Sequence, residues 1–158
     1  MQVLEERIHF GKDIHPEVNA CLQEAVACAS DFNRARALLY KARDIQPDQL
    51  EVYVALYKFC FYRGFLDEAE QVAKDALKQS ACNGGFEADW RQLDEHSTDW
   101  TLGEGPARLY LYSLKALSFI RLRQGRHEQA RASLAKLKQL DVNDLVGGSV
   151  IMELAEAL

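Results

Sequence analysis

Three stretches of this chain repeat one another at a fixed spacing, and this periodicity constrains the fold more than any other feature. The stretches cover residues 31–47, 64–81 and 125–142. When they are overlaid, Ala35, Ala69 and Ala130 coincide. Ala35 and Ala69 are 34 residues apart, and Ala130 follows after 61, which is one period of 34 plus 27 inserted residues. Such self-similarity predicts a repeat protein, in which each unit buries its apolar face only by stacking on its neighbours.

Each repeat predicts a pair of helices. Apolar residues recur every three or four positions, as in Leu134, Leu137 and Leu140, which is the period of a helix with one buried face. Gly64 and Gly125 suit the tight turn inside a pair, because glycine readily adopts a positive φ. The predicted helices cover about residues 16–30, 33–45, 49–63, 66–79, 106–124 and 127–140.

A small side chain at Ala35, Ala69 and Ala130 lets the two helices of each pair approach closely, whereas a bulky one would hold them apart. Together with the 34-residue period and Pro47 after the first pair, this pattern resembles the tetratricopeptide-repeat (TPR) family. One departure is Tyr57, which stands where the family usually has glycine or alanine. The resemblance covers about residues 16–83 and 111–144.

The resemblance implies an all-α fold, a short TPR-like helical-hairpin solenoid formed by a single domain over residues 1–158. The repeats would span about residues 16–49, 50–83 and 111–144, with an insertion at 84–110 and a capping helix at 145–158. A solenoid needs such a cap because its last unit otherwise exposes an apolar face.

Both ends of the chain carry apolar side chains that could cover open faces. The C-terminal stripe consists of Val150, Ile151, Leu154 and Leu158. Ser149 before it is a candidate N-cap. A dimer contact is the alternative reading of this stripe. Near the other end we expect Val3, Leu4, Ile8 and Phe10 to pack on the open face of the first unit.

The insertion contains both tryptophans of the chain, Trp90 and Trp100, and the repeats do not explain it. Phe86, Trp90 and Leu93 follow helical spacing. Long inserted loops in compact domains usually carry either structure or function. Two alternatives therefore stay open: the tryptophans pack back on the solenoid, or they form a lid over its groove.

Charge is unevenly distributed along the chain. Residues 106–139 hold eight basic residues and one acidic residue, a net charge of +7, so the rest of the chain carries −12 of the total of −5. A basic third unit beside an acidic insertion indicates either internal docking or an acidic partner. Nucleic acid is not expected as a partner, because the chain is acidic overall and has no recognisable nucleic-acid-binding motif.

TPR solenoids usually bind ligands along the surface formed by the first helix of each pair, and the resemblance carries this surface over by register. The partner-binding groove would then be lined by Lys58, Phe61, Tyr62, Tyr112, Lys115, Phe119 and Arg123. Cations beside aromatic rings would suit a peptide with acidic and apolar or aromatic side chains. The alternative is that the aromatic residues only pack between helices and the cations are solvated.

No pattern in the sequence indicates catalysis, a metal or another cofactor. The four histidines have no acid or nucleophile at a motif spacing, and Cys21, Cys28, Cys60 and Cys82 match no common metal-ligand pattern. We therefore expect no enzyme and no cofactor. No apolar run is long enough to span a membrane, and the N-terminus does not read as a signal peptide, so a cytoplasmic protein is expected.

Three functional hypotheses follow. The first is a non-enzymatic protein–protein interaction module, an adaptor or assembly factor, working as a monomer or weak homodimer. The second is a small dedicated chaperone, because three-repeat secretion chaperones are of similar size and unit count. The third is a metal- or cofactor-handling accessory protein that uses the cysteines.

Overall fold

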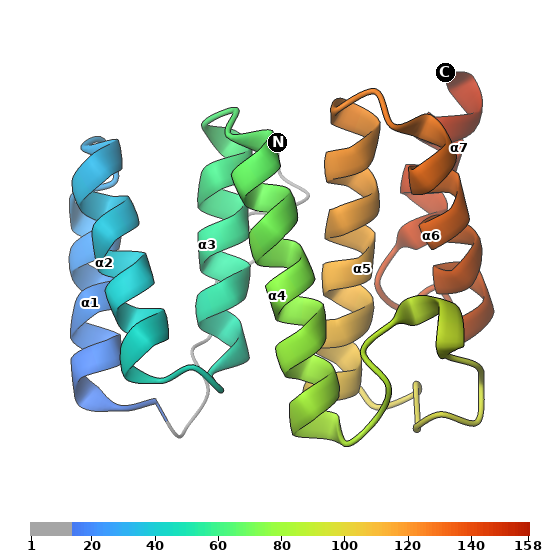
Figure 1. Ribbon diagram of the computed structural model, residues 1–158, viewed down its shortest axis with the longest axis horizontal. Helices are drawn as coiled ribbons and strands as arrows, with labels where there is room; N and C mark the ends of the chain where they lie inside the picture. The colour runs from blue at the N-terminus through green and yellow to red at the C-terminus, as the bar shows by residue number, and fades with distance from the viewer. Residues whose placement is uncertain (1–13) are drawn as a thin grey trace.

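The computed structural model describes residues 14–158, and within them the regular secondary structure is all helical, as predicted (Figure 1). The helices are α1 (Pro16–Ala27), α2 (Phe32–Ile45), α3 (Leu50–Tyr62), α4 (Leu66–Gly84), α5 (Pro106–Arg123), α6 (His127–Leu140) and α7 (Gly148–Ala157), with a short 3-10 helix, η2 (Trp90–Gln92). The predicted starts of the first six α-helices agree with these to within one residue, whereas the cap, predicted from residue 145, begins at Gly148. The main difference is α4, which continues to Gly84 rather than ending near residue 79.

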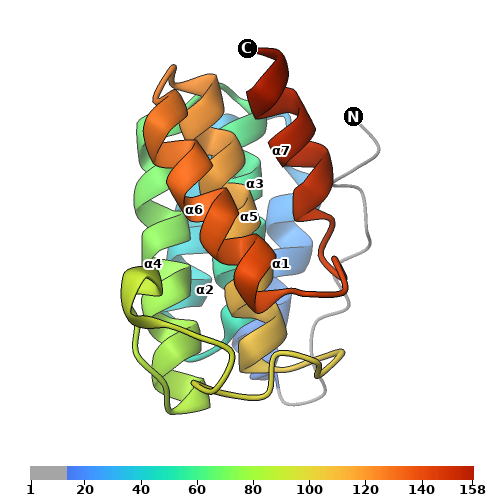
Figure 2. The same ribbon diagram turned by 90° about the vertical axis from the view of Figure 1, so that its right-hand side faces the viewer.

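The first six α-helices form three antiparallel hairpins that stand side by side: α1 with α2, α3 with α4, and α5 with α6 (Figure 1). Seen from the end of the stack, they separate into two layers (Figure 2). We call α1, α3, α5 and α7 the A layer, and α2, α4 and α6 the B layer. The insertion between α4 and α5 runs along one end of the stack and beside the B layer.

Small side chains lie where the helices of each hairpin meet. Ala35, Ala69 and Ala130 are each completely buried, one in each B-layer helix. The turns that bring the helices together are closed in the same way in the second and third hairpins. Gly64 and Gly125 have φ values of 82° and 79°, a region that side chains rarely adopt. The hairpin geometry therefore follows from residues that the sequence repeats.

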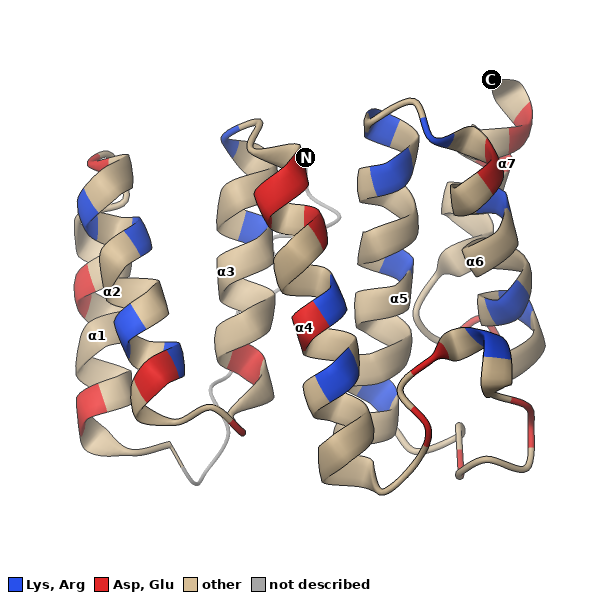
Figure 3. Ribbon diagram, viewed as in Figure 1, with Lys and Arg blue, Asp and Glu red and all other residues tan. Residues whose placement is uncertain are grey.

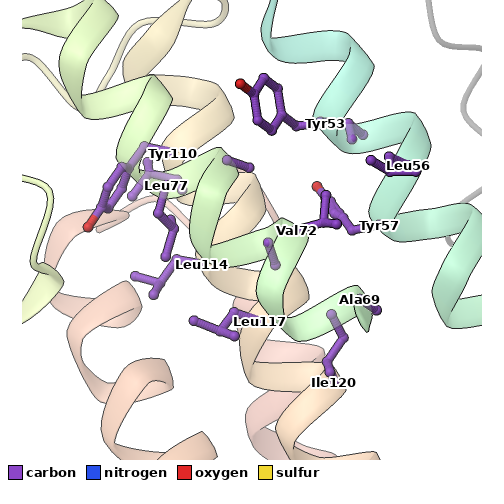
Figure 4. Close-up of a cluster of buried hydrophobic side chains, with 14 of the residues drawn as sticks. Tyr53, Leu56, Tyr57, Ala69, Val72, Leu77, Tyr110, Leu114, Leu117 and Ile120 are labelled. Atoms are coloured by element: carbon purple, nitrogen blue, oxygen red, sulfur yellow. The ribbon is translucent and has the colours of Figure 1, made fainter. Parts of the chain in front are cut away.

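The core is continuous from the second hairpin to the third. Figure 4 shows side chains from α3, α4 and α5 pointing toward one another, among them Tyr57, Val72 and Leu114, all at most 1% exposed. Tyr110 of α5 is fully buried, and its hydroxyl donates to the Ala88 carbonyl oxygen of the insertion at 2.6 Å. Each hairpin therefore buries its apolar face against the next, as a solenoid requires.

Ion pairs join neighbouring hairpins along the B layer. Glu68 of α4 accepts hydrogen bonds from Arg36 Nε at 2.7 Å and from the Tyr40 hydroxyl at 3.1 Å, both on α2. One hairpin further along, Arg126 before α6 pairs with Glu70 of α4 at 2.8 Å. Because both carboxylates are on α4, this helix connects the first hairpin to the third.

The cap is present, but its first turn differs from the prediction. Gly147 is the residue that precedes α7, and Ser149 lies inside the helix, where its hydroxyl donates to the Asp144 carboxylate instead of capping. Gly148 allows the close approach to α6, because a Cβ there would lie 2.6 Å from Leu137 Cδ2. The N-terminal packing expected for Val3, Leu4, Ile8 and Phe10 falls outside the described residues.

Ala130→Leu should destabilise the protein by about 1–3 kcal/mol, because a larger side chain in the buried contact between α5 and α6 forces the helices apart. Ala132→Leu, at an exposed position on the same helix, should change stability by less than about 0.5 kcal/mol. Urea unfolding followed by circular dichroism measures both. Equal effects of the two substitutions would show that close approach at Ala130 is unimportant.

The Glu68 cluster should make stability depend on pH. The hydrogen bond from Arg36 is the largest cause that holds the pKa of Glu68 below its ordinary value of 4.5. The contribution of ionised Glu68 to the free energy of unfolding is therefore fully present above pH 4.5. It is lost as the pH falls through the lower pKa that Glu68 has in the folded state. Glu68→Gln should cost about 1 kcal/mol at pH 7, since Arg36 is partly exposed, and the difference from the parent should vanish near pH 2. A difference that persists unchanged at low pH in urea titrations would contradict this origin.

Candidate functional site

A cavity of about 430 Å³ opens on the A layer between α3, α5 and α7. All seven residues predicted for the groove line it: Lys58, Phe61 and Tyr62 on α3, and Tyr112, Lys115, Phe119 and Arg123 on α5. They lie together because residues spaced by three or four positions share one face of a helix, and α3 and α5 turn equivalent faces to the same side. Their role in binding stays a prediction; their placement around one cavity is observed.

Aromatic rings form much of the cavity wall. The Phe61 and Phe119 ring centroids are 5.2 Å apart across the α3–α5 boundary, and Tyr62 lies edge-on to Phe61 at 5.7 Å. Phe61 and Phe119 therefore do pack between helices, as one of the two alternatives held. They also remain partly accessible from the cavity, and Tyr62 is 47% exposed. The same rings serve both inter-helix packing and the surface of the groove.

The cavity carries positive charge at three points. Lys58 Nζ and Lys115 Nζ lie 5.2 Å and 4.9 Å from the centroid of the Tyr112 ring, within the range of cation–π attraction. Arg123 lies at the exposed end of α5. Lys115 is only 9% exposed, and its charge contributes to the lowered pKa of Asp144, after the larger effect of hydrogen bonds from Ser149. None of the described lining residues is Asp or Glu, so the local field favours anionic groups.

Tyr57 gives the cavity wall a buried polar group. It is 1% exposed, and burial raises the pKa of its hydroxyl. The hydroxyl lies near Ser113 of α5 but makes no hydrogen bond of normal geometry with any described residue. A buried hydroxyl without a partner costs about 1–3 kcal/mol.

The third wall of the cavity, α7, was not predicted from the sequence. Ile151 and Ala155 face inward and are buried, as the capping role requires. Val150 and Leu154 line the cavity together with Ile151 and are 53% and 47% exposed. The sequence does contain a feature that indicates this wall. The apolar residues of α7 cover two adjacent faces of the helix, and a cap needs only one.

The insertion packs against the helices and contributes no described residue to the cavity lining. Trp100 is 5% exposed; its ring lies 5.2 Å from Phe86 and 6.0 Å from Tyr110, and its indole N–H donates to the Asp94 carbonyl oxygen. Trp90 is partly buried on the same core, within η2. Trp100 thus follows the packing alternative, and neither tryptophan is placed as a lid in this structure.

Internal docking of unlike charges is not seen between the insertion and the third hairpin. Figure 3 shows the acidic residues of the insertion and the basic residues of α5 and α6. Within residues 14–158, no ion pair joins the two groups. Lys136 of α6 instead donates a hydrogen bond from Nζ to the Leu93 carbonyl oxygen of the insertion at 2.6 Å. The basic side chains of the cavity are therefore not neutralised by the insertion.

The cysteines do not gather into a site. All four are free thiols: Cys21 and Cys60 are buried, Cys28 is partly buried and Cys82 is exposed. Burial, and then a hydrogen bond to Glu68, raises the pKa of Cys60 to about 12. Across the described residues, no three His, Cys, Asp or Glu side chains are placed to share a metal ion. Nor is any described helix both long and apolar enough to cross a membrane.

Fold and cavity together define a class of protein: an all-α stack of helical hairpins with a cationic, aromatic groove on one layer. No protein-family model matches the chain, and no solved structure does. A protein of Azotobacter chroococcum mcd 1, described as an uncharacterized 19.8 kDa protein in the nifW 5' region, is 29% identical over 148 residues. The similarity covers 92% of this chain and 82% of that relative, so it extends well beyond a single repeat.

Alkylation of the native protein by iodoacetamide at pH 8 should modify Cys82 first and Cys60 last. Cys82 is exposed, whereas Cys60 is buried and its raised pKa leaves almost no thiolate to react. Peptide mass spectrometry at successive times gives the order, and unfolding in urea should make all four thiols react. Rapid modification of native Cys60 would indicate a reactive thiol and would favour the accessory-protein hypothesis.

Proposed function

We propose that this protein is a non-enzymatic protein–protein interaction module, an adaptor or assembly factor. It binds an acidic, aromatic-rich peptide segment of another protein in the cavity between α3, α5 and α7. The observation that carries the proposal is the lining of that cavity: aromatic and aliphatic walls, three cations and no carboxylate among the described residues.

The shape and chemistry of the cavity support a peptide as the ligand. A volume of about 430 Å³ accommodates a few side chains rather than a whole domain. The exposed side chains of Tyr62, Val150 and Leu154 border the cavity. A bound peptide would remove their apolar surface from water, which favours binding. Lys58 and Arg123 would meet carboxylates of the peptide and set its orientation.

The proposal extends to the repeat family and to the cellular location. We propose that the chain is a TPR protein, supported by its three hairpins, by the 34-residue period and by the small residues where the paired helices meet. We also propose a cytoplasmic location, which the four free thiols favour, because thiols persist in reducing compartments.

The proposal predicts which peptides the protein selects from a random display library. Selected sequences should combine Asp or Glu with aromatic or aliphatic residues. Lys58→Glu combined with Arg123→Glu should weaken their binding at least tenfold, as measured by fluorescence anisotropy, because each reversal replaces an attraction by a repulsion. Lys115 is left unchanged, since a carboxylate at this nearly buried position would disturb the fold itself.

The matched control is Lys41→Glu combined with Lys78→Glu, which makes the same change of charge at exposed positions of the B layer. It should bind the selected peptides within about threefold of the parent, because distant surface charges are screened at physiological salt. Circular dichroism should show equal helicity in all three proteins. Selection of basic peptides, or equal affinity for the Lys58–Arg123 variant, would refute the groove.

A further inference from the structure

We propose that residues 1–13 of this chain are themselves a ligand of the cavity, so that a partner must displace them to bind. The inference rests on the proposed function of the cavity and adds regulation to it. It is drawn from the residue types of the segment, from its length and from the point at which the described chain begins.

The composition of the segment complements the cavity. Its apolar residues include Val3, Leu4, Ile8 and Phe10, and between them stand two adjacent acids, Glu5 and Glu6. Arg7 follows these acids, and Lys12 and Asp13 end the segment, so its net charge is −1. The cavity offers aromatic and aliphatic walls with Lys58, Lys115 and Arg123. The segment thus contains the combination of side chains that the cavity is proposed to select from other proteins.

The described chain begins on the correct layer. Ile14 is partly buried against the core, and the backbone N–H of His15 donates to Gln46 Oε1 at 3.0 Å, which fixes the start of α1 to the connection between α2 and α3. Because α1 belongs to the A layer, the described chain begins on the same layer that carries the cavity (Figure 2).

The segment is also long enough. Glu6 precedes Ile14 by eight residues, which span up to about 28 Å when extended. Lys58 and Lys115 are eight and nine residues from the starts of α3 and α5, about 12–14 Å along each helix. These helices begin at the same end of the stack as α1 (Figure 1). An interhelical spacing of about 10 Å would place them roughly 10 Å and 20 Å from α1. The direct paths are therefore about 16 Å and 24 Å, within the reach of Glu6.

Tethering makes even a weak ligand effective. A ligand joined to its site by a short linker has a local concentration in the millimolar range. A segment whose own dissociation constant is about 0.1 mM would then occupy most of the cavities and weaken external peptides about tenfold. A partner that binds more tightly would still displace it.

Zero-length cross-linking of the full chain with a carbodiimide tests the contact. Glu5 and Glu6 should link to Lys58 or Lys115 at least ten times more often than to Lys41 or Lys78 in the B layer. The Glu70–Lys74 ion pair, at 3.1 Å, serves as the internal control for the reagent. If that control pair links while Glu5 and Glu6 link equally to all lysines, or to none, the proposal is wrong.

Binding of a labelled synthetic peptide with the sequence of residues 1–13 tests the regulation. The full-length Glu5→Lys, Glu6→Lys variant should bind this peptide about tenfold more tightly than the parent, because its own segment no longer competes. The charge-matched control, Glu95→Lys with Glu104→Lys in the insertion, should bind like the parent. Equal affinity of parent and Glu5–Glu6 variant would overturn the inference.

The two proposals fail in different ways. The peptides obtained by display on the parent protein provide the second probe for the same variants. If they bind the cavity and the Glu5–Glu6 variant gains no affinity for them, the interaction module stands and the internal ligand is excluded. If no display peptide depends on Lys58 and Arg123, the proposed function fails, whatever the cross-links show.

Discussion

Close approach of paired helices at small buried residues is the constraint on which the rest of this structure depends. Ala35, Ala69 and Ala130 each occupy a completely buried position in a B-layer helix. Because only a methyl group separates the helices there, each hairpin is thin enough to stack on the next and to bury a continuous core. The carboxylates of Glu68 and Glu70 then join α4 to the hairpins on either side.

The cavity is a consequence of that stacking. Parallel placement of α3 and α5 brings equivalent faces to one side, so that aromatic and basic residues from two repeats meet. The last helix, α7, closes the stack with one face and adds Val150 and Leu154 to the cavity with the next. A single helix thus ends the core and extends the surface offered to a ligand. Lys58 and Lys115, beside the Tyr112 ring, make this surface positively charged.

Sequence reasoning succeeded where structure is local and repeated. Helical periodicity and Gly64 and Gly125 predicted the hairpins, because both act within one turn of the chain. Register between repeats then placed the seven groove residues of α3 and α5. It failed where a residue has two roles or no counterpart in another repeat: the apolar stripe of α7 was interpreted as a cap or a dimer contact, and its place in the cavity wall was not predicted. For Trp90 and Trp100 the sequence left two alternatives open, because only the packed chain shows that Trp100 lies against Tyr110.

The central claim is that this stack presents the α3–α5–α7 face to another polypeptide. Backbone NMR of the full chain, titrated with a peptide obtained by display, tests it most directly because it reports on every helix at once. The account predicts that shifts concentrate in the second half of α3, the second half of α5 and the middle of α7, around Phe61, Phe119 and Leu154. Shifts confined to the B layer or to the insertion, with this face unchanged, would contradict it.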